Sequence, residues 1–261
     1  MNKIVIESIS QKKNSKKFVV KTSEEEYVMT EDTIIKFHIF KDKEFSKMDF
    51  KKIIYDIKIN ESFNKVLNYL NYGPRSEYEI RLYIQKNDKE KTLKVKDYNE
   101  IIARLRSLNY VNDELYAKQI VDYYKATKGK NYIKQYLREK RVDNSIIENS
   151  ILLIEDDEEI EIALKIANKY VQTIRKYPFK KQKEMTMNKL LRSGFSSNLI
   201  SKIISKIDFI DESDFSLKKD YLKIIKRLEK KDMSCYEKKQ YILNSLLAKG
   251  YEYKNINNII K

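Results

Sequence analysis

Three similar stretches decide the fold of this chain: Leu137–Val142 (LREKRV), Leu190–Phe195 (LLRSGF) and Leu246–Tyr251 (LLAKGY). In each, an amphipathic helical pattern ends in a short turn, and a second apolar stretch follows. The stretches begin 53 and 56 residues apart. Repetition on this scale is typical of stacked helical units, each too small to bury its own apolar face alone. Gly194 and Gly250 stand at equivalent turns, where a left-handed residue is expected after a helix.

The composition favours helices joined by short connections. Of the 261 residues, 36% are charged and 41% hydrophobic, so the chain is polar but not typical of a disordered protein. It contains only four Gly and two Pro, which is few for a β-rich fold. No apolar run approaches the ~18 residues of a membrane-spanning helix. The start of the chain alternates rather than forming a signal-peptide core, so we expect a cytoplasmic protein that binds no membrane.

The first ~60 residues differ from the rest because their hydrophobic pattern alternates. Lys3–Ile9 and Lys17–Lys21 predict two strands, and Asn14–Lys16 between them suits a hairpin turn. Tyr27–Met29 predicts a third strand. Thr30 and Ser46 each resemble the N-cap of a following helix. The pattern predicts a small β-sheet with one or two helices.

From Ser62 onward the apolar spacing is helical throughout, and Ser76–Glu79 (SEYE) forms a capping-box pattern. We therefore predict a mainly α protein in which tandem three-helix repeats form an elongated, curved solenoid behind a small N-terminal β-containing domain. The expected organisation is an N-terminal domain at 1–60, helical repeats at 61–110, 111–154 and 155–208, and an additional C-terminal repeat at 209–261.

The net charge of +15 suggests a polyanionic partner such as nucleic acid. An AT-rich genome offers a second explanation, because only nine of the 54 basic residues are Arg and Lys, Ile, Asn and Tyr are abundant. Codon bias accounts less well for local clustering. Between Lys165 and Lys206 there are eleven basic residues and one acid, Glu184.

The alternative for this segment is a solvated helix that follows the acidic run 155–161, since acids at a helix start and bases further along suit the helix dipole. The dipole does not need eleven cations, so we favour a basic face that binds a polyanion. The candidate residues are Lys169, Arg175, Lys176, Lys180, Lys181 and Arg192.

The inventory of reactive side chains gives no basis for an enzyme. His38 is the only histidine and Cys235 the only cysteine, so the usual metal sites and nucleophile–histidine pairs have no ligands or partners. We interpret Cys235 as a packing residue. The four glycines are too far apart for a phosphate-binding loop, and consecutive acids in 155–161 point to different helix faces. We expect no catalytic residue, no cofactor and no metal, and we interpret most of Tyr116, Tyr123, Tyr124, Tyr132 and Tyr136 as core or half-buried rather than base-stacking.

Four motifs in order resemble those of the RecX regulatory proteins. Tyr72–Ile80 (YGPRSEYEI) resembles the family's R-S-x-x-E-L pattern, and Leu108–Ala117 (LNYVNDELYA) resembles its L-x-x-x-G-[YF]-[IL]-[DN]-D-x-x-[YF]-A pattern. Asn109 replaces the family's Gly there, which is a residue that tolerates the left-handed conformation. Lys128–Ile133 (KGKNYI) is similar to the family's basic-Gly stretch, and Leu191–Ser196 (LRSGFS) to its L-x-R-[RK]-G-F-[SD] close. The repeat from about Asp214 goes beyond the minimal three-repeat pattern.

The resemblance implies a monomeric, non-catalytic regulator that binds the filament of the RecA recombinase. Such a protein would inhibit the ATPase, strand-exchange and coprotease activities of RecA, and so modulate recombination, DNA repair and the SOS response. Single-stranded DNA, bound through the basic face, is a second expected partner. Two alternatives stay open on sequence alone: a stand-alone DNA-binding protein, and a helical-repeat adaptor for other proteins.

Overall fold

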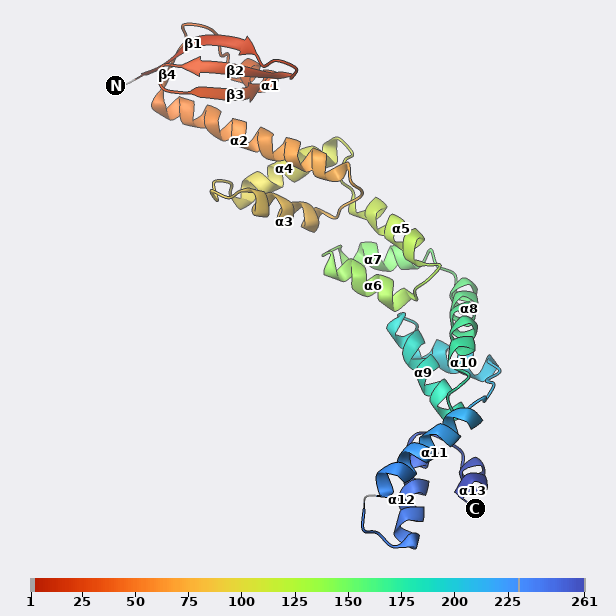
Figure 1. Cartoon of the computed structure of the whole chain (residues 1–261). Helices are drawn as coiled ribbons and strands as arrows, with labels where there is room; N and C mark the ends of the chain where they lie inside the picture. The colour runs from red at the N-terminus through yellow and green to blue at the C-terminus, as the bar shows by residue number, and fades with distance from the viewer. Residues whose placement is uncertain (1–2, 230, 261) are drawn as a thin grey trace. The chain divides into compact units, whose positions relative to one another are not determined.

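The computed structural model describes residues 3–229 and 231–260. An antiparallel sheet of four strands lies near the N-terminus, and the rest of the described chain is helical (Figure 1). The strands are β1 (Lys3–Gln11), β2 (Lys17–Thr22), β3 (Glu26–Thr30) and β4 (Glu44–Ser46). The helices are α1 (Glu31–Lys36), α2 (Lys47–Leu70), α3 (Glu77–Asn87), α4 (Val95–Ser107), α5 (Asp113–Tyr124), α6 (Lys130–Glu139), α7 (Asn144–Ile151), α8 (Asp156–Ile174), α9 (Phe179–Arg192), α10 (Ser197–Lys206), α11 (Asp214–Leu228), α12 (Cys235–Ala248) and α13 (Tyr253–Ile260). The mainly α fold with a small N-terminal β-containing domain is confirmed.

The chain divides into two compact parts. One part runs from the N-terminus to Tyr116 and includes Lys140–Val142, and the other comprises Ala117–Glu139 and the chain from Asp143 onward. Helix α5 therefore contributes its first turn to one part and its remainder to the other.

The N-terminal sheet is antiparallel with strand order β3-β2-β1-β4. The turn between β1 and β2 contains Asn14 with a positive φ of 57°, so the predicted hairpin is confirmed. Inward-facing residues such as Ile6 and Val20 pack against Phe50 and Ile53 of α2, and this apolar contact holds the helix on the sheet. The pattern did not reveal β4, which has only three residues.

Helix α2 connects the sheet to the first helical repeat. Ser46 caps it by accepting a hydrogen bond from the backbone N–H of Asp49, as the sequence predicts. Phe50 lies in the core of the sheet, whereas Phe63 lies in the next apolar cluster along the same helix. The boundary that we place after residue 60 thus falls inside a continuous helix.

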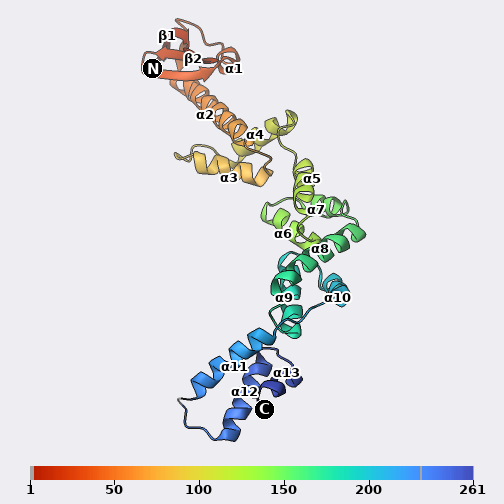
Figure 2. The ribbon, with the colours of Figure 1, turned by 45° about the vertical axis from the view of Figure 1, so that its right-hand side comes forward.

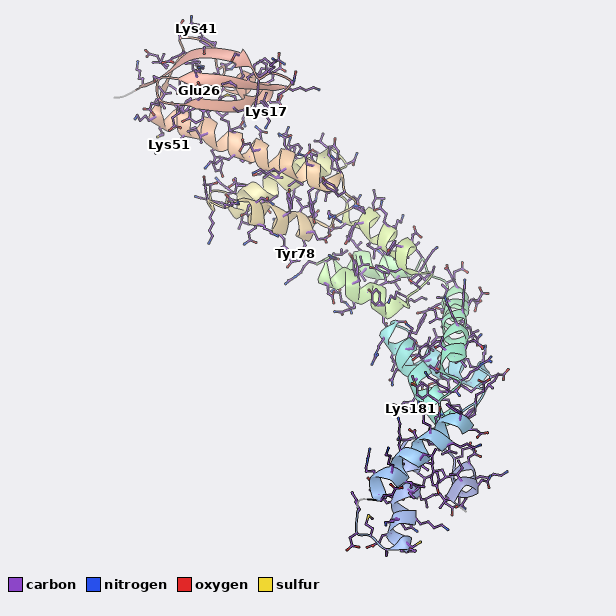
Figure 3. All side chains as sticks on the ribbon, viewed as in Figure 1. Lys17, Glu26, Lys41, Lys51, Tyr78 and Lys181 are labelled. Atoms are coloured by element: carbon purple, nitrogen blue, oxygen red, sulfur yellow. The ribbon has the colours of Figure 1, made fainter. Side chains whose placement is uncertain are left out.

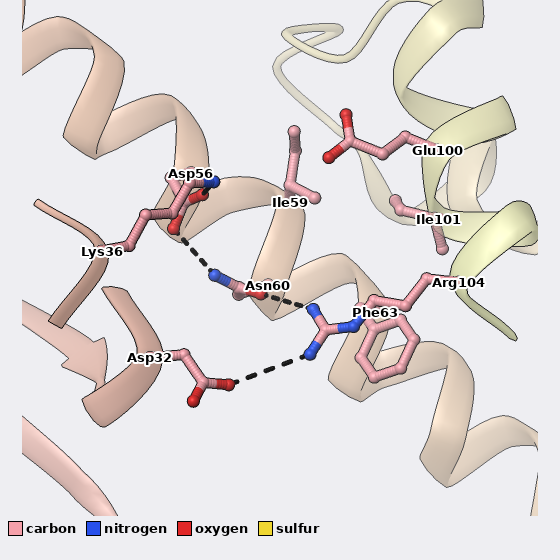
Figure 4. A pocket seen from close by; sticks show the side chains of 9 residues that line it. All are labelled: Asp32, Lys36, Asp56, Ile59, Asn60, Phe63, Glu100, Ile101 and Arg104. Carbon is pink, nitrogen blue, oxygen red and sulfur yellow. Dashed lines mark hydrogen bonds and ion pairs between the residues drawn. The ribbon is translucent and has the colours of Figure 1, made fainter. Parts of the chain in front are cut away.

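Polar contacts hold α1, α2 and α4 together around a small cavity (Figure 4). Asp56 accepts hydrogen bonds from Lys36 and Thr33, and from the amide of Asn60, at 2.5–2.9 Å. Asn60 in turn accepts from Arg104 at 3.0 Å. Because these groups satisfy one another, we interpret this cavity as a structural contact between the sheet domain and the first repeat.

The helices pack in threes. In one part of the chain, α3 and α4 pack on α2 around Phe63, Val66 and Ile80. In the other part, α8–α10 enclose one core and α11–α13 another, and Figure 2 shows the last three helices side by side. Among the described residues, each of these three cores buries seven to nine apolar side chains.

Helix capping follows the sequence pattern. The capping box of Ser76 and Glu79 is present at the start of α3. Gly194 and Gly250 have φ values of 87° and 92°, which confirms the predicted left-handed turns. Asn109 is also left-handed, with φ of 57°, as the resemblance requires at that position. Arg141 occupies the first of the three repeated turns with φ of 55°, although no glycine marks it in the sequence.

Candidate functional site

Each repeated turn lies against the N-terminal end of a helix that precedes it in the chain, and we call these three contacts junctions. At each junction a carboxylate that follows in the chain also accepts the first helical N–H. Asp113 accepts from Glu77 at the start of α3, Glu159 from Lys130 at the start of α6, and Asp211 from Phe179 at the start of α9. This recurring cap satisfies one otherwise free backbone donor at each helix start.

The first junction is closed by side chains. The hydroxyl of Ser76 donates to the carbonyl of Lys140 at 3.0 Å, and the Lys140 ammonium pairs with Glu79 at 2.5 Å. Burial is the main cause that raises the pKa of Asp113 here, and the neighbouring charge of Glu77 adds to it.

The second junction is closed by the backbone. The N–H of Gly129 donates to the carbonyl of Ser193 at 2.8 Å, and the N–H of Asn131 donates to that of Gly194 at 3.1 Å. The two segments are so close that a Cβ added to Gly194 would lie 2.3 Å from the backbone N of Tyr132. A Cβ on Gly129 would lie 2.5 Å from the Gly194 carbonyl oxygen, so both glycines are needed for this approach.

The third junction is open. Pro178 precedes α9 where Gly129 precedes α6, and proline has no N–H to donate to the turn. A Cβ on Gly250 would lie 3.7 Å from the backbone N of Lys181, an ordinary contact distance. In the described part of the chain, no backbone hydrogen bond joins residues 249–251 to α9. The turn and the helix therefore enclose a groove of roughly 660 Å³ instead of a sealed contact.

Lysines dominate this groove, which we call the lysine groove. Three segments form it: the start of α9 with the turn before it, one face of α11, and the turn after α12. Figure 3 shows Lys181 where α9 approaches α11. The lysines that line it are Lys176, Lys180, Lys181, Lys219, Lys223 and Lys249, and the acids are Glu184 and Asp220.

Only part of this positive charge is neutralised locally. Lys181 pairs with Glu184 and Lys249 with Asp220, each at 2.9 Å. Within residues 3–229 and 231–260, no carboxylate lies within 4.0 Å of the ammonium groups of the other four lysines, Lys176, Lys180, Lys219 and Lys223. Four lysines thus line the groove without an acidic partner, which favours an anionic ligand.

Asp220 fixes the turn that forms one wall of the groove. Its carboxylate accepts a hydrogen bond from the Tyr251 hydroxyl at 3.0 Å besides its ion pair with Lys249. Burial alone would raise the pKa of Asp220, but these hydrogen bonds and the charges of Lys249 and Lys223 outweigh it and lower the pKa. Burial, with the hydrogen bond to Asp220, raises the pKa of Tyr251. Asp220 therefore stays ionised and holds Tyr251 at neutral pH.

Gln182 fixes the opposite wall. Its side chain is fully buried, and its amide nitrogen lies 2.7 Å from the carbonyl oxygen of Tyr177 and 2.8 Å from that of Ile210. It therefore ties the turn that carries Lys176 to the segment before α11. The sequence did not reveal this role, because a glutamine within a lysine-rich helix has the pattern of a solvent-exposed residue.

The structure brings three of the six predicted binding residues together: Lys176, Lys180 and Lys181 line the groove. The other three do not line it. Arg175 pairs with Glu212 at 3.6 Å, and Lys169 and Arg192 are exposed on α8 and α9. Three further lysines of the groove, Lys219, Lys223 and Lys249, were not predicted because they lie beyond the basic segment. The lysine-rich pattern of α11 is the signal that could have indicated the first two.

Two other predicted residue roles have mixed outcomes. Cys235 is exposed at the start of α12, so our interpretation of it as a packing residue is wrong. Of the five tyrosines, Tyr123 is 74% exposed, whereas the remaining four are buried or half-buried, as predicted. The Tyr124 ring contacts Tyr132 and Tyr136, and burial, followed by these neighbours, raises its pKa to about 12.

The fold defines a class: a protein of successive three-helix units that follow a small antiparallel sheet. Among the described residues, no helix combines the length and apolar character needed to cross a bilayer. The family model for the second three-helix domain of RecX matches residues 112–151.

Two known proteins that are similar to this chain share a name. A "Regulatory protein RecX" of Streptococcus agalactiae serotype V is 30% identical over 263 residues, covering 98% of each chain, and one of Bacillus subtilis is 25% identical, covering 97% of this chain and 96% of that protein. The chain therefore belongs to the RecX family of regulatory proteins.

Solved structures agree in fold. A crystal structure of regulatory protein RecX superimposes with a TM-score of 0.66 at 23% identity, covering 78% of this chain and all of that one. The crystal structure of RecX from Lactobacillus salivarius gives a TM-score of 0.51 at 28% identity, covering 57% of this chain and 96% of that one. The tandem helical architecture is thus shared with experimentally determined members.

Proposed function

We propose that this chain regulates the RecA recombinase without catalysing a reaction of its own. It binds the RecA filament on single-stranded DNA and inhibits ATP hydrolysis, strand exchange and coprotease activity, and it thereby modulates recombination and repair. The observation that carries this proposal is the near full-length match to RecX regulatory proteins. The protein acts in the cytoplasm as a monomer.

The structure supports the proposal through the form of the binding surface. Successive three-helix units present many helix ends and turns to a partner, as helical-repeat proteins do when they bind extended polymers. The third repeat, with Lys169, Arg175, Lys176, Lys180, Lys181 and Arg192, supplies the basic face toward the filament.

The test is the DNA-dependent ATPase of the cognate RecA on single-stranded DNA, titrated with the full chain. We expect inhibition at or below one chain per RecA monomer, together with loss of strand exchange. Unchanged RecA activity over a broad titration would exclude this function. ATP hydrolysis by the chain itself, above that of a purified blank, would contradict its non-catalytic character.

The alternative function is DNA binding that is independent of RecA. The lysine groove is complete within this chain, so nucleic acid could be bound without a recombinase. A stand-alone DNA-binding protein would bind DNA but leave RecA unaffected, whereas a protein adaptor without a nucleic-acid role would do neither.

A further inference from the structure

We propose that the lysine groove at the third junction binds a single-stranded nucleic acid, with the phosphodiester backbone along its lysines and a base stacked on Tyr177. The inference deepens the proposed function, on which it rests for its biological setting. The proposed binding site includes residues of the fourth repeat, whereas the sequence placed the basic binding face in the third repeat alone.

The first support is the origin of the groove. The second junction has the same helix end and the same type of left-handed turn, yet backbone hydrogen bonds seal it. At the third junction Pro178 has no backbone N–H, so the donor equivalent to the Gly129 N–H is missing. A Cβ added to Gly250 would lie 3.7 Å from the backbone N of Lys181, whereas a Cβ added to Gly194 would lie 2.3 Å from that of Tyr132. At the third junction the turn thus contacts α9 without a backbone hydrogen bond, and the groove opens beside this contact.

The second support is the charge around that space. Six lysines from three segments face two acids, and four of the lysines have no acidic partner within ion-pair distance in the described chain. Lysine binds phosphate as a compact point charge, and a groove with several lysines follows a charged backbone without reading sequence.

The third support is an aromatic ring at the same place. Tyr177 lines the groove and is 36% exposed, with the Lys176 ammonium 5.5 Å from its ring centroid. A basic groove with an accessible aromatic ring is the arrangement that proteins use for single strands, whose unpaired bases can stack. An acidic peptide would use the lysines but not the ring, which is why we assign a nucleic-acid strand.

The experiment measures binding of a fluorescently labelled oligothymidylate to the full chain by anisotropy, without any recombinase, across a salt series. The test variant combines Lys180→Ala, Lys219→Ala and Lys223→Ala. Its matched control combines Lys189→Ala, Lys218→Ala and Lys226→Ala, which removes the same charge from exposed positions of the same two helices outside the groove. Far-UV circular dichroism and thermal unfolding confirm that both variants keep the fold.

We expect the groove variant to bind roughly tenfold more weakly at low salt, with a salt slope smaller by about 2, since each lost single-strand phosphate contact removes about 0.7. The control should stay within about twofold, because screened charges away from the ligand contribute little. Equal weakening of both variants would overturn the proposal, as it would show that the overall charge rather than the groove binds DNA.

Two further measurements distinguish a stacked nucleic-acid strand from an acidic protein segment as the ligand. Tyr177→Ala should weaken binding about fivefold or more through lost stacking while leaving the salt slope unchanged. No effect of this change would overturn the stacked strand. Polyglutamate at equal charge should compete poorly, and competition equal to that of oligothymidylate would replace the nucleic acid with an acidic protein segment.

Failure of this inference is distinguishable from failure of the proposed function. A groove variant that binds DNA normally rejects the site, whatever RecA does. Unchanged RecA activity in the presence of the unaltered chain rejects the regulator, whatever the groove binds.

Discussion

The second and third junctions have the same parts but opposite consequences. At the second, Gly129 and Gly194 bring a turn and a helix end together until backbone hydrogen bonds form between them. At the third, Pro178 stands in place of Gly129, and the turn at Gly250 contacts α9 with no backbone hydrogen bond between them in the described chain. A single replacement at a helix N-cap thus accompanies the change from a structural contact to a groove.

The lysines at the two junctions also differ in whether they have an acidic partner. Lys130 at the second junction pairs with Asp156 at 2.6 Å and lies 3.9 Å from Glu159, so this cation is used within the fold. At the third junction Lys180, Lys219 and Lys223 have no such partner in the described residues. Charge that is paired contributes to folding, whereas charge that is left unpaired at an open groove is available to a ligand.

The largest expected effect is on stability at the second junction. Gly194→Ala forces a side chain into a left-handed turn and places its Cβ 2.3 Å from Tyr132. We expect a loss of about 3 kcal/mol, because the conformational cost adds to overpacking of 1–3 kcal/mol. Thermal unfolding of the full chain measures it, and hydrogen exchange at the Asn131 amide should show that the junction itself has opened.

Gly250→Ala is the matched control for that change. Its φ of 92° gives the same backbone cost, but its Cβ would meet nothing closer than 3.7 Å. We expect a loss of only about 1 kcal/mol. Equal losses for Gly194→Ala and Gly250→Ala would contradict the distinction between a closed and an open junction.

A smaller effect is expected from Gln182→Met, which keeps the volume of the side chain but removes its amide. The carbonyls of Tyr177 and Ile210 then lose their hydrogen-bond donor. We expect a loss of about 2 kcal/mol, within the 1–3 kcal/mol of a buried unsatisfied polar group. Affinity for oligothymidylate should fall as well, since the wall that carries Lys176 loosens.

The control for Gln182→Met is Gln172→Met, which makes the same chemical change at an exposed position of α8. Surface substitutions of this kind usually change stability by less than about 0.5 kcal/mol. If chemical denaturation finds the two variants alike, Gln182 does not hold the groove wall.

The sequence predicted what depends on local chemistry. The capping box at Ser76, the hairpin at Asn14 and the left-handed turns at Gly194 and Gly250 each follow from the conformational preferences of a few neighbouring residues, and all are present. The turn at Arg141 is the exception, because a long side chain there gives no signal that distinguishes it from a helical residue.

The sequence could not predict what depends on contacts between repeats. Lys176 and Lys249 are far apart in the chain, and only the packing of α9 beside α11 and the final turn brings them to one groove. The sequence does show that proline, which lacks a backbone N–H, stands in place of Gly129 at the third junction. The consequence could not be predicted, because it depends on the hydrogen bond that the Gly129 N–H donates to the turn of the next repeat.

The smallest expected effect concerns Asp220, the acid that limits the positive charge of the open junction. Its pKa is lowered in the folded chain, so its ionised form stabilises the fold above its ordinary pKa of about 4, and this contribution is lost as pH falls through the lowered value. Asp220→Asn should therefore cost less than about 1 kcal/mol at pH 7, since the ion pair is partly exposed. The cost should disappear at strongly acidic pH.

Asp220→Asn should also raise the affinity of the groove for nucleic acid, because the groove gains one net positive charge when Asp220 is neutralised. We expect oligothymidylate to bind about two- to threefold more tightly at low salt, with the gain vanishing at high salt as screening increases. Asp232→Asn makes an identical charge change at an exposed position outside the groove and should leave the affinity unchanged. A gain of the same size in both variants would mean that the strand responds to total charge and that Asp220 has no special place beside it.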